Sequence, residues 1–205
     1  MNDRETHWEN VYTSKSSTEV SWYQPKPDLS LRLIHDTGLD KDSPLIDIGG
    51  GASTLVDTLY DEGYTAITVL DVSASALAHA RDRLGEKADG IRWIETDIMV
   101  FEPHRRYQLW HDRAVFHFLT EQKDRALYVE TMKRTLLPGG DVIIMTFAVD
   151  GPKKCSGLDI VQYDAEKLQR ELGHGFELLD SGHETHITPA GGKQKFAWFR
   201  LTRRP

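Results

Sequence analysis

Short apolar runs alternate with amphipathic stretches along most of the chain. The apolar residues of segment 45–48 suit a strand covered on both faces, and three successive glycines follow that segment. Apolar residues at helical spacing separate most of the later runs. The runs predict strands at residues 45–48, 65–71, 90–98, 107–113, 141–147, 176–180 and 195–202. The spacing predicts helices at residues 5–13, 28–34, 54–60, 73–84, 123–137 and 163–172.

The order of these elements predicts an α/β fold. Strands that alternate with helices form a parallel sheet, whereas the last two strands have no helix between them and predict a hairpin whose turn spans residues 183–192. A Leu-Pro-Gly-Gly turn at 137–140 closes the long helix before it. We see no internal repeat and no interdomain linker, so we expect one domain over residues 1–205, with residues 1–27 as an N-terminal arm or lid.

Two adjacent aromatic residues, Trp22 and Tyr23, lie in the predicted loop of this arm, before Pro25. Such a pair is unusual in a mere linker. It either closes over a pocket or anchors the arm on the core, and the sequence leaves both interpretations open.

Acidic residues and glycines gather where the predicted parallel strands end. Gly49, Gly50 and Gly51 follow the first strand and would let a ligand lie against bare backbone. Asp71 ends the second strand, where a carboxylate either accepts hydrogen bonds from ribose hydroxyls or caps the next helix. Ser73 is an alternative cap, which would leave Asp71 for the ligand. The pattern predicts a nucleotide-like ligand at this edge of the sheet.

Composition narrows the partners and the compartment. Hydrophobic residues make up 39% of the chain and charged residues 28%, which is ordinary for a globular protein. The net charge of −7 argues against a broad phosphate-binding surface, so we expect no nucleic-acid partner. We expect no membrane partner, because no run approaches the ~18 apolar residues of a span. Since the single Cys155 cannot form an internal disulfide and no secretory signal is present, we expect a cytoplasmic protein.

Together these landmarks resemble the class I S-adenosylmethionine-dependent methyltransferases, in motifs over residues 45–147 and in element order to residue 201. The family's first motif is an acidic residue before a G-x-G-x-G turn, which here is Asp47, Gly49 and Gly51 with Ser53 in place of the final glycine. The Leu-Pro-Gly-Gly turn is also typical of the family. A nicotinamide-dependent dehydrogenase, the competing class, would need glycine in place of Thr54.

The resemblance implies a Rossmann-like seven-stranded mixed sheet of order 3-2-1-4-5-7-6, with the last strand antiparallel and helices on both faces. It also implies S-adenosyl-L-methionine as the cofactor. In that family Asp47 would lie near the cofactor's ammonium group, Asp71 would hold the ribose and Asp97 with Ile98 the adenine. The full set of expected cofactor-binding residues is Trp22, Tyr23, Asp47, Gly49, Gly50, Gly51, Asp71, Val72, Asp97, Ile98 and Asp112.

Candidates for the acceptor side follow the fourth strand. His111, Asp112 and His117 are the expected residues for orienting the acceptor or accepting its proton. Strand alternation puts His111 and Asp112 on opposite faces, so we expect one of them to point into the site. Two alternatives stay open for His117, a hydrogen-bonded core histidine or an acceptor-orienting one. Arg113 would pair with Asp112 or meet an acidic substrate or the cofactor carboxylate.

The sequence predicts no metal site. His183 and His186 face opposite ways in extended chain, which is poor spacing for a shared ion. Metal-dependent relatives of this class carry an Asp-Asn pair after the fifth strand, and this chain has none. Cys155 is either a reactive thiol or a plain loop cysteine.

We therefore expect a methyltransferase that acts on a small-molecule acceptor. Analogy with small thiol, halide and thiopurine methyltransferases, which share the short aromatic arm, makes a thiol the candidate nucleophile. The alternatives are a protein methyltransferase that modifies a lysine or another side chain, and a non-catalytic subunit that binds the cofactor.

Overall fold

A computed structural model describes residues 3–205, so residues 1 and 2 of the predicted arm lie outside the described part. Seven strands form the main sheet: β1 (Leu45–Ile48), β2 (Ile67–Asp71), β3 (Arg92–Glu95), β4 (Tyr107–Arg113), β5 (Leu136–Phe147), β8 (Phe176–Ile187) and β9 (Lys193–Arg203). Their order is β3-β2-β1-β4-β5-β9-β8. The first five pair in parallel, whereas β9 is antiparallel to both neighbours. Once the separate β6–β7 hairpin is set aside, this is the predicted 3-2-1-4-5-7-6 order, which is confirmed.

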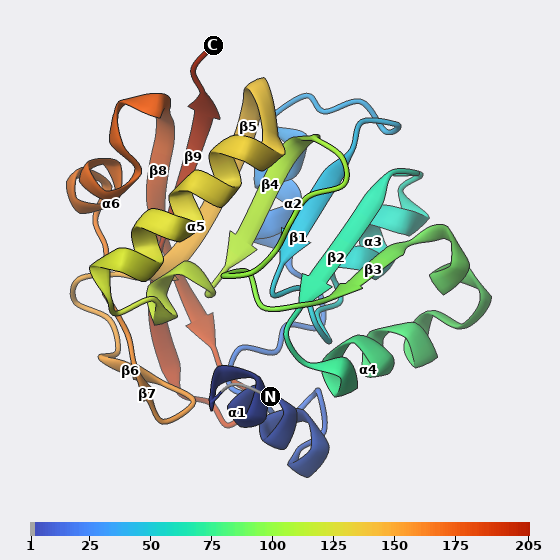
Figure 1. The fold of residues 1–205 in the computed structure, drawn as a ribbon. Coiled ribbons are helices and arrows are strands. Elements are labelled where there is room, and N and C mark those ends of the chain that lie inside the picture. Colours follow the sequence, from blue (N-terminus) through green and yellow to red (C-terminus); the bar gives the residue numbers. More distant parts are fainter. Residues whose placement is uncertain (1–2) are drawn as a thin grey trace.

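Helices cover both faces of the sheet (Figure 1). They are α1 (Asp3–Ser14), α2 (Asp28–His35), α3 (Leu55–Asp61), α4 (Ala74–Leu84), α5 (Gln122–Thr135) and α6 (Ala165–Leu172), with short 3-10 turns η1 (Gly85–Gly90), η2 (Phe116–Phe118) and η3 (Gly173–Gly175). One core lies between the sheet and α5 with α6, and a second lies between the sheet and α2, α3 and α4. Every residue of β1 and β2 is buried, because each strand meets a core on both sides.

Two segments lie at the end of the sheet to which β1, β2 and β4 point (Figure 1). One is α1, and the other is a small hairpin of β6 (Lys154–Cys155) and β7 (Leu158–Asp159). The carboxyl ends of parallel strands are where α/β proteins bind ligands, so these segments cover the expected site.

Two sequence predictions need correction. The last hairpin turns at residues 188–192 and not over 183–192, because β8 continues to Ile187 and pairs with the start of β9. As an edge strand with mostly exposed side chains, β8 lacks the apolar alternation that would reveal its length. In addition, α5 ends at Thr135, and the Leu-Pro-Gly-Gly segment lies within β5 as a bulge, since pairing with β4 passes from Leu136 directly to Asp141.

Among residues 3–205, no helix combines the length and the apolar character that spanning a bilayer requires.

Candidate functional site

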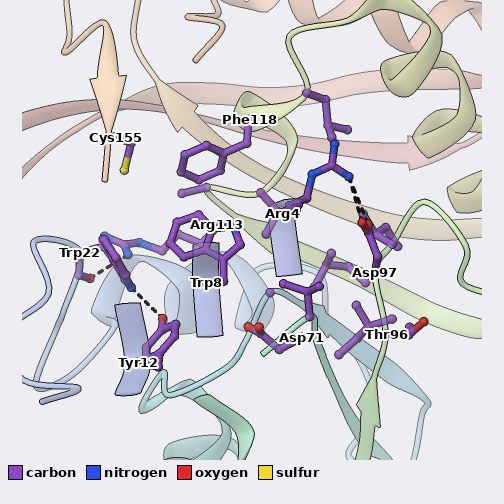
Figure 2. A pocket seen from close by; sticks show the side chains of 18 of the residues that line it. Arg4, Trp8, Tyr12, Trp22, Asp71, Thr96, Asp97, Arg113, Phe118 and Cys155 are labelled. Carbon is purple, nitrogen blue, oxygen red and sulfur yellow. Dashed lines mark hydrogen bonds and ion pairs between the residues drawn. The ribbon is translucent and has the colours of Figure 1, made fainter. Parts of the chain in front are cut away.

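Two adjoining cavities lie over the carboxyl ends of β1, β2 and β4. The first holds about 830 Å³ of empty space, counting the part open to solvent, and the second about 560 Å³. The cavities share five lining residues, namely Tyr12, Trp22, Ile48, Gly49 and Arg113. Figure 2 shows the first cavity, with Asp97 and Thr96 at one end and Trp22 and Cys155 at the other.

The glycine turn after β1 packs directly on two carboxylates. A Cβ added at Gly50 would lie 2.5 Å from Oδ2 of Asp47, and one added at Gly51 would lie 2.5 Å from Oδ2 of Asp71. Gly49 has a φ of +64° that side chains rarely adopt. The sequence predicted bare backbone for the ligand. The structure adds that the carboxylates of Asp47 and Asp71 occupy the space where side chains at Gly50 and Gly51 would begin.

Asp71 is a buried carboxyl group that lines the first cavity. Its Oδ1 accepts the N–H of Ser73 at 2.9 Å, while the Ser73 hydroxyl accepts the N–H of Ala76 and caps α4. The alternative in which Ser73 caps the helix is therefore the observed one. Burial raises the pKa of Asp71 to about 7, and the nearby charge of Asp47 adds to this effect. Two hydrogen bonds from ribose hydroxyls would favour its ionised form.

Asp97, which follows β3, lies at the other end of the first cavity. Its Oδ1 accepts the N–H of Met99 at 3.0 Å, and its carboxylate pairs with Nη1 of Arg4 at 3.2 Å. Arg4 also pairs with Asp124 on α5 at 3.2 Å. The apolar residues Leu70, Val72, Ile98 and Leu119 line the space beside them. Apolar side chains beside a carboxylate suit an adenine ring, which has apolar faces and polar edges.

The helix α1 is tied down over this region. The carboxylate of Glu9 accepts hydrogen bonds from the Ser73 hydroxyl at 2.7 Å, from the backbone N–H of Ser75 at 3.2 Å and from the Ser75 hydroxyl. Trp8 packs edge-on against Trp22 and Phe118, at centroid distances of 5.7 and 5.0 Å. The arm therefore both covers the cavities and is anchored on the fold, so the two sequence interpretations are compatible.

Trp22 and Tyr23 lie in the loop that follows α1. Trp22 lines both cavities and donates its indole N–H to the Tyr12 hydroxyl at 3.2 Å. Tyr23 lines the second cavity. The structure thus brings both predicted aromatics to the site.

A buried polar chain runs from the second cavity into the core. Oδ1 of Asp47 lies 2.6 Å from Nδ1 of His111, and Nε2 of His111 lies 3.0 Å from the hydroxyl of Ser30. Asp47 and His111 line the second cavity, as the alternation along β4 allows. Because the imidazole fixes one carboxylate oxygen, Asp47 is held toward the position expected for the cofactor's ammonium group.

Asp112 faces the opposite side of β4 and lines neither cavity. Its carboxylate is fully buried and accepts the N–H groups of Val115 and Phe116, at 2.8 and 3.0 Å, and the hydroxyl of Tyr128. Burial raises the pKa of Asp112 to about 6. The side chain organises the turn after β4 and does not reach the site, in contrast to the prediction that placed it at the cofactor.

His117 also lies in the core. Its Nδ1 accepts the N–H of Phe147 at 3.3 Å, which leaves the ring proton on Nε2, and no described residue forms a hydrogen bond with Nε2. Burial, with the charge of Arg113, lowers the pKa of His117 to about 3. A neutral imidazole that already carries a proton on its free nitrogen cannot accept another. This geometry agrees with the core interpretation of His117 and gives no support to a catalytic base.

The acceptor end of the first cavity is built from residues far apart in sequence. Arg113 donates from Nη1 to the carbonyl of Trp22 at 3.1 Å, and its guanidinium lies 5.0 Å from the ring centroid of Phe196 on β9. Cys155, from the β6–β7 hairpin, lines the same space. Burial raises the pKa of Cys155 to about 12, so it is a neutral thiol and the plain-cysteine interpretation is favoured.

Sequence reasoning missed several residues that line the first cavity. Arg4 and Phe196 carried no signal, because neither follows a predicted strand end. The aromatic face of α1 was a usable signal, since Trp8 and Tyr12 share it and both line the cavity. In the part of the chain that the structure describes, no group of three or more histidine, cysteine, aspartate or glutamate residues is arranged to hold a metal ion.

Comparison with known proteins agrees with this geometry. Residues 45–140 match the family described as Methyltransferase domain. The solved structure of an S-adenosylmethionine-dependent methyltransferase from Anabaena variabilis has a TM-score of 0.78 at 18% identity, covering 100% of this chain and 96% of that one. The N-methyltransferase NodS from Bradyrhizobium japonicum, in complex with S-adenosylhomocysteine, has a TM-score of 0.73 at 17% identity, covering 96% and 98%. The chain thus has the fold of the class I S-adenosylmethionine-dependent methyltransferases, and the family match over residues 45–140 supports S-adenosylmethionine as its cofactor.

One curated relative is named for a protein acceptor. The zebrafish (Danio rerio) protein named eEF1A lysine and N-terminal methyltransferase is 25% identical over 180 residues, which cover 85% of this chain. The match covers 26% of that protein, so this chain spans about a quarter of the length of the curated relative.

Proposed function

We propose that this chain transfers a methyl group from S-adenosylmethionine to a small molecule, with a thiol as the candidate nucleophile. The observation that carries this proposal is that two segments of the chain partly cover the acceptor end. Trp22, Phe118, Phe196 and Cys155 line it, and α1 and the β6–β7 hairpin lie over it. An extended protein segment would need an open groove, whereas a small molecule needs only an enclosed pocket.

The chain's own residues would hold the cofactor along the two cavities. Asp97 and Ile98 would bind the adenine and Asp71 with Val72 the ribose, while Asp47, with His111 behind it, would hold the ammonium group. Gly49, Gly50 and Gly51 would form the floor, and Trp22 and Tyr23 would cover the methionine end. When bound, the cofactor would supply a methyl group on a positively charged sulfur for transfer to the acceptor, with S-adenosylhomocysteine as the product.

The acceptor end favours a nucleophile that needs little help in losing its proton. The titratable groups that line it are Tyr12, Arg113 and Cys155. Burial raises the pKa values of the Tyr12 hydroxyl and the Cys155 thiol, so neither is a base near neutral pH. A thiol ionises readily by itself, and a cation such as Arg113 would favour its thiolate. An amine or alcohol would need a base more strongly.

A protein methyltransferase is the second candidate, and the name of the zebrafish relative favours it. The net charge of −7 would attract a basic protein segment. A non-catalytic subunit that binds the cofactor is the third. We also propose that residues 1–205 act as one methyltransferase domain with residues 1–27 as its cover, and that the chain works in the cytoplasm.

The test is release of S-adenosylhomocysteine with a panel of small thiols, amines and carboxylates, against release with a cell protein extract. We expect release with at least one small thiol and none with protein. Release with extract alone would support the protein methyltransferase, and tight cofactor binding without release under any condition would support the binding subunit.

A further inference from the structure

Arg113 carries an unpaired hydrogen-bond donor inside the site. Nη1 donates to the carbonyl of Trp22, but Nη2 is buried and has no hydrogen-bond partner among residues 3–205. The guanidinium lies over the ring of Phe196, and Arg113 lines both cavities. Within residues 3–205 it takes part in no ion pair, whereas the other arginine of the first cavity, Arg4, pairs with two carboxylates.

Negative charges near Arg113 favour its protonated form, but none of them forms an ion pair with it within residues 3–205. Burial lowers its pKa, whereas the charges of Glu184 and Asp47 raise it from beyond ion-pair distance. An arginine stays protonated even in such a place. Arg113 is partly exposed, but its Nη2 is shielded from water, and a shielded N–H on a cation is costly unless an acceptor meets it. Glu184 supplies a nearby negative charge but forms no ion pair with Arg113 among residues 3–205, so Nη2 is open to an anionic group of a ligand.

Two carboxylates could supply that anion, one from the cofactor and one from the acceptor. The position of Arg113 favours the acceptor. Its guanidinium extends toward Trp22, on the side of the cavity away from Asp97 (Figure 2). The cofactor's carboxylate must lie near its ammonium group and hence near Asp47, where Ser53 and Tyr23, which line the second cavity, offer hydroxyls as alternative partners.

We propose that the methyl acceptor carries a carboxylate and that Arg113 binds it, as a specificity-determining residue. This inference rests on the proposed function, since it names the class of small molecule that is methylated. A planar guanidinium donates two parallel hydrogen bonds to a carboxylate, and here Nη2 is the free donor. These hydrogen bonds orient the acceptor with its carboxylate at Arg113.

The experiment compares matched acids and amides by calorimetry, using protein saturated with S-adenosylhomocysteine. The probes are 3-mercaptopropionate against 3-mercaptopropionamide, and 2-mercaptobenzoate against 2-mercaptobenzamide. We expect each acid to bind roughly tenfold to a hundredfold more tightly than its amide, from the charge-assisted hydrogen bonds. Arg113→Met should abolish this preference, and Arg113→Lys should keep part of it as a point charge.

Arg32→Met is the matched control. Arg32 on α2 also lies over an aromatic ring of β9, at 5.3 Å from the centroid of Trp198, but its side chain is 55% exposed and lines neither cavity. Its replacement should leave the preference for acids unchanged. Melting curves establish whether each variant folds. If Arg113→Met does not, Arg113→Lys and Arg113→Gln provide the comparison.

Several results would overturn the proposal. These are equal binding of acid and amide, no binding of either acid at millimolar concentration, or an unchanged preference in a folded variant that lacks the cation. Weaker binding of S-adenosylhomocysteine by Arg113→Met, with the acid preference intact, would assign the anion to the cofactor instead. The preference is measured without turnover. Turnover that ignores the acid group would therefore contradict this inference alone, and acid binding without turnover would contradict the methyltransferase assignment alone.

Discussion

The two ends of the first cavity differ in charge and in how their polar groups are satisfied. At the cofactor end, Asp71 and Asp97 each accept a backbone N–H from the loop that follows their own strand. At the acceptor end, Nη2 of Arg113 is buried and has no hydrogen-bond partner in the described part of the chain. The chain therefore completes the cofactor end by itself, whereas the ligand must complete the acceptor end. The cofactor site is therefore preorganised. Under our proposal, the acceptor must supply the anionic group that Nη2 of Arg113 lacks.

The largest effect should come from His117→Ala, which tests whether His117 belongs to the core or to the acceptor site. Removing this fully buried ring leaves a cavity and an unpaired Phe147 N–H, so we expect a loss of unfolding free energy of about 3 kcal/mol. Turnover per folded molecule should be unchanged. Chemical denaturation and active-site titration measure the two quantities. A stable variant with lost turnover would instead place His117 in the acceptor site.

Asp71→Ala tests the cofactor end directly. We expect cofactor binding to weaken by roughly 1–3 kcal/mol, because hydrogen bonds from the ribose to a charged group are lost. Calorimetry with S-adenosylhomocysteine measures this change. Asp42→Ala, in the exposed loop before β1, is the matched control and should bind normally. An unchanged affinity of Asp71→Ala would remove the ribose role from this residue.

The raised pKa of Asp71 predicts a pH dependence of the cofactor end. Its carboxyl group has a pKa of about 7 in the folded chain, above the ordinary value of 3.8, so it is largely protonated below pH 7. A protonated carboxyl cannot accept both ribose hydroxyls. Cofactor affinity should therefore fall as the pH drops below 7, by up to about tenfold per unit.

The same shift acts on stability with the opposite trend. The folded chain holds a proton that the unfolded chain has lost between pH 4 and 7, so the contribution of Asp71 to stability decreases as the pH rises through that window. Asp71→Asn should flatten both profiles, as measured by calorimetry and by denaturation at each pH. If cofactor affinity and stability keep their pH dependence in Asp71→Asn, another group must be responsible for the titration.

The smallest effect should come from Arg4→Ala, which loosens the cover at the cofactor end. Its ion pairs with Asp97 and Asp124 are partly exposed, and such pairs contribute at most about 1 kcal/mol. We expect S-adenosylhomocysteine to dissociate up to roughly fivefold faster, as measured by stopped-flow fluorescence of the nearby tryptophans. A dissociation rate equal to that of the unchanged chain would show that α1 does not hold the cofactor in place.

The sequence predicted the cofactor end better than the acceptor end, for a physical reason. Asp47, Asp71 and Asp97 each follow a short apolar run, and parallel pairing brings the ends of such runs to one edge. The local pattern and the strand topology were therefore sufficient to predict that these three acids lie at one edge of the sheet. Arg113 and Phe196 meet because β9 pairs with β5, which is a contact that no local pattern encodes.

Asp112 shows the limit of a strand pattern. Alternation correctly separated it from His111, but the pattern carries no information on which face of β4 holds the cavity. The structure answers this through the turn after β4, where Ala114 has a φ of +72° and Asp112 binds the N–H groups of Val115 and Phe116. The length of β8 was missed because its edge position allows polar residues on both faces.

The glycine turn after β1 has a consequence for protein design. Gly50 and Gly51 leave room for the carboxylates of Asp47 and Asp71, so these two glycines are required by packing within the protein. A designer who transplants this loop onto another α/β scaffold must transfer both acids and the start of α4 with it. The transferable unit is thus the ends of two neighbouring strands, and a loop moved alone would lose the partners that require its glycines.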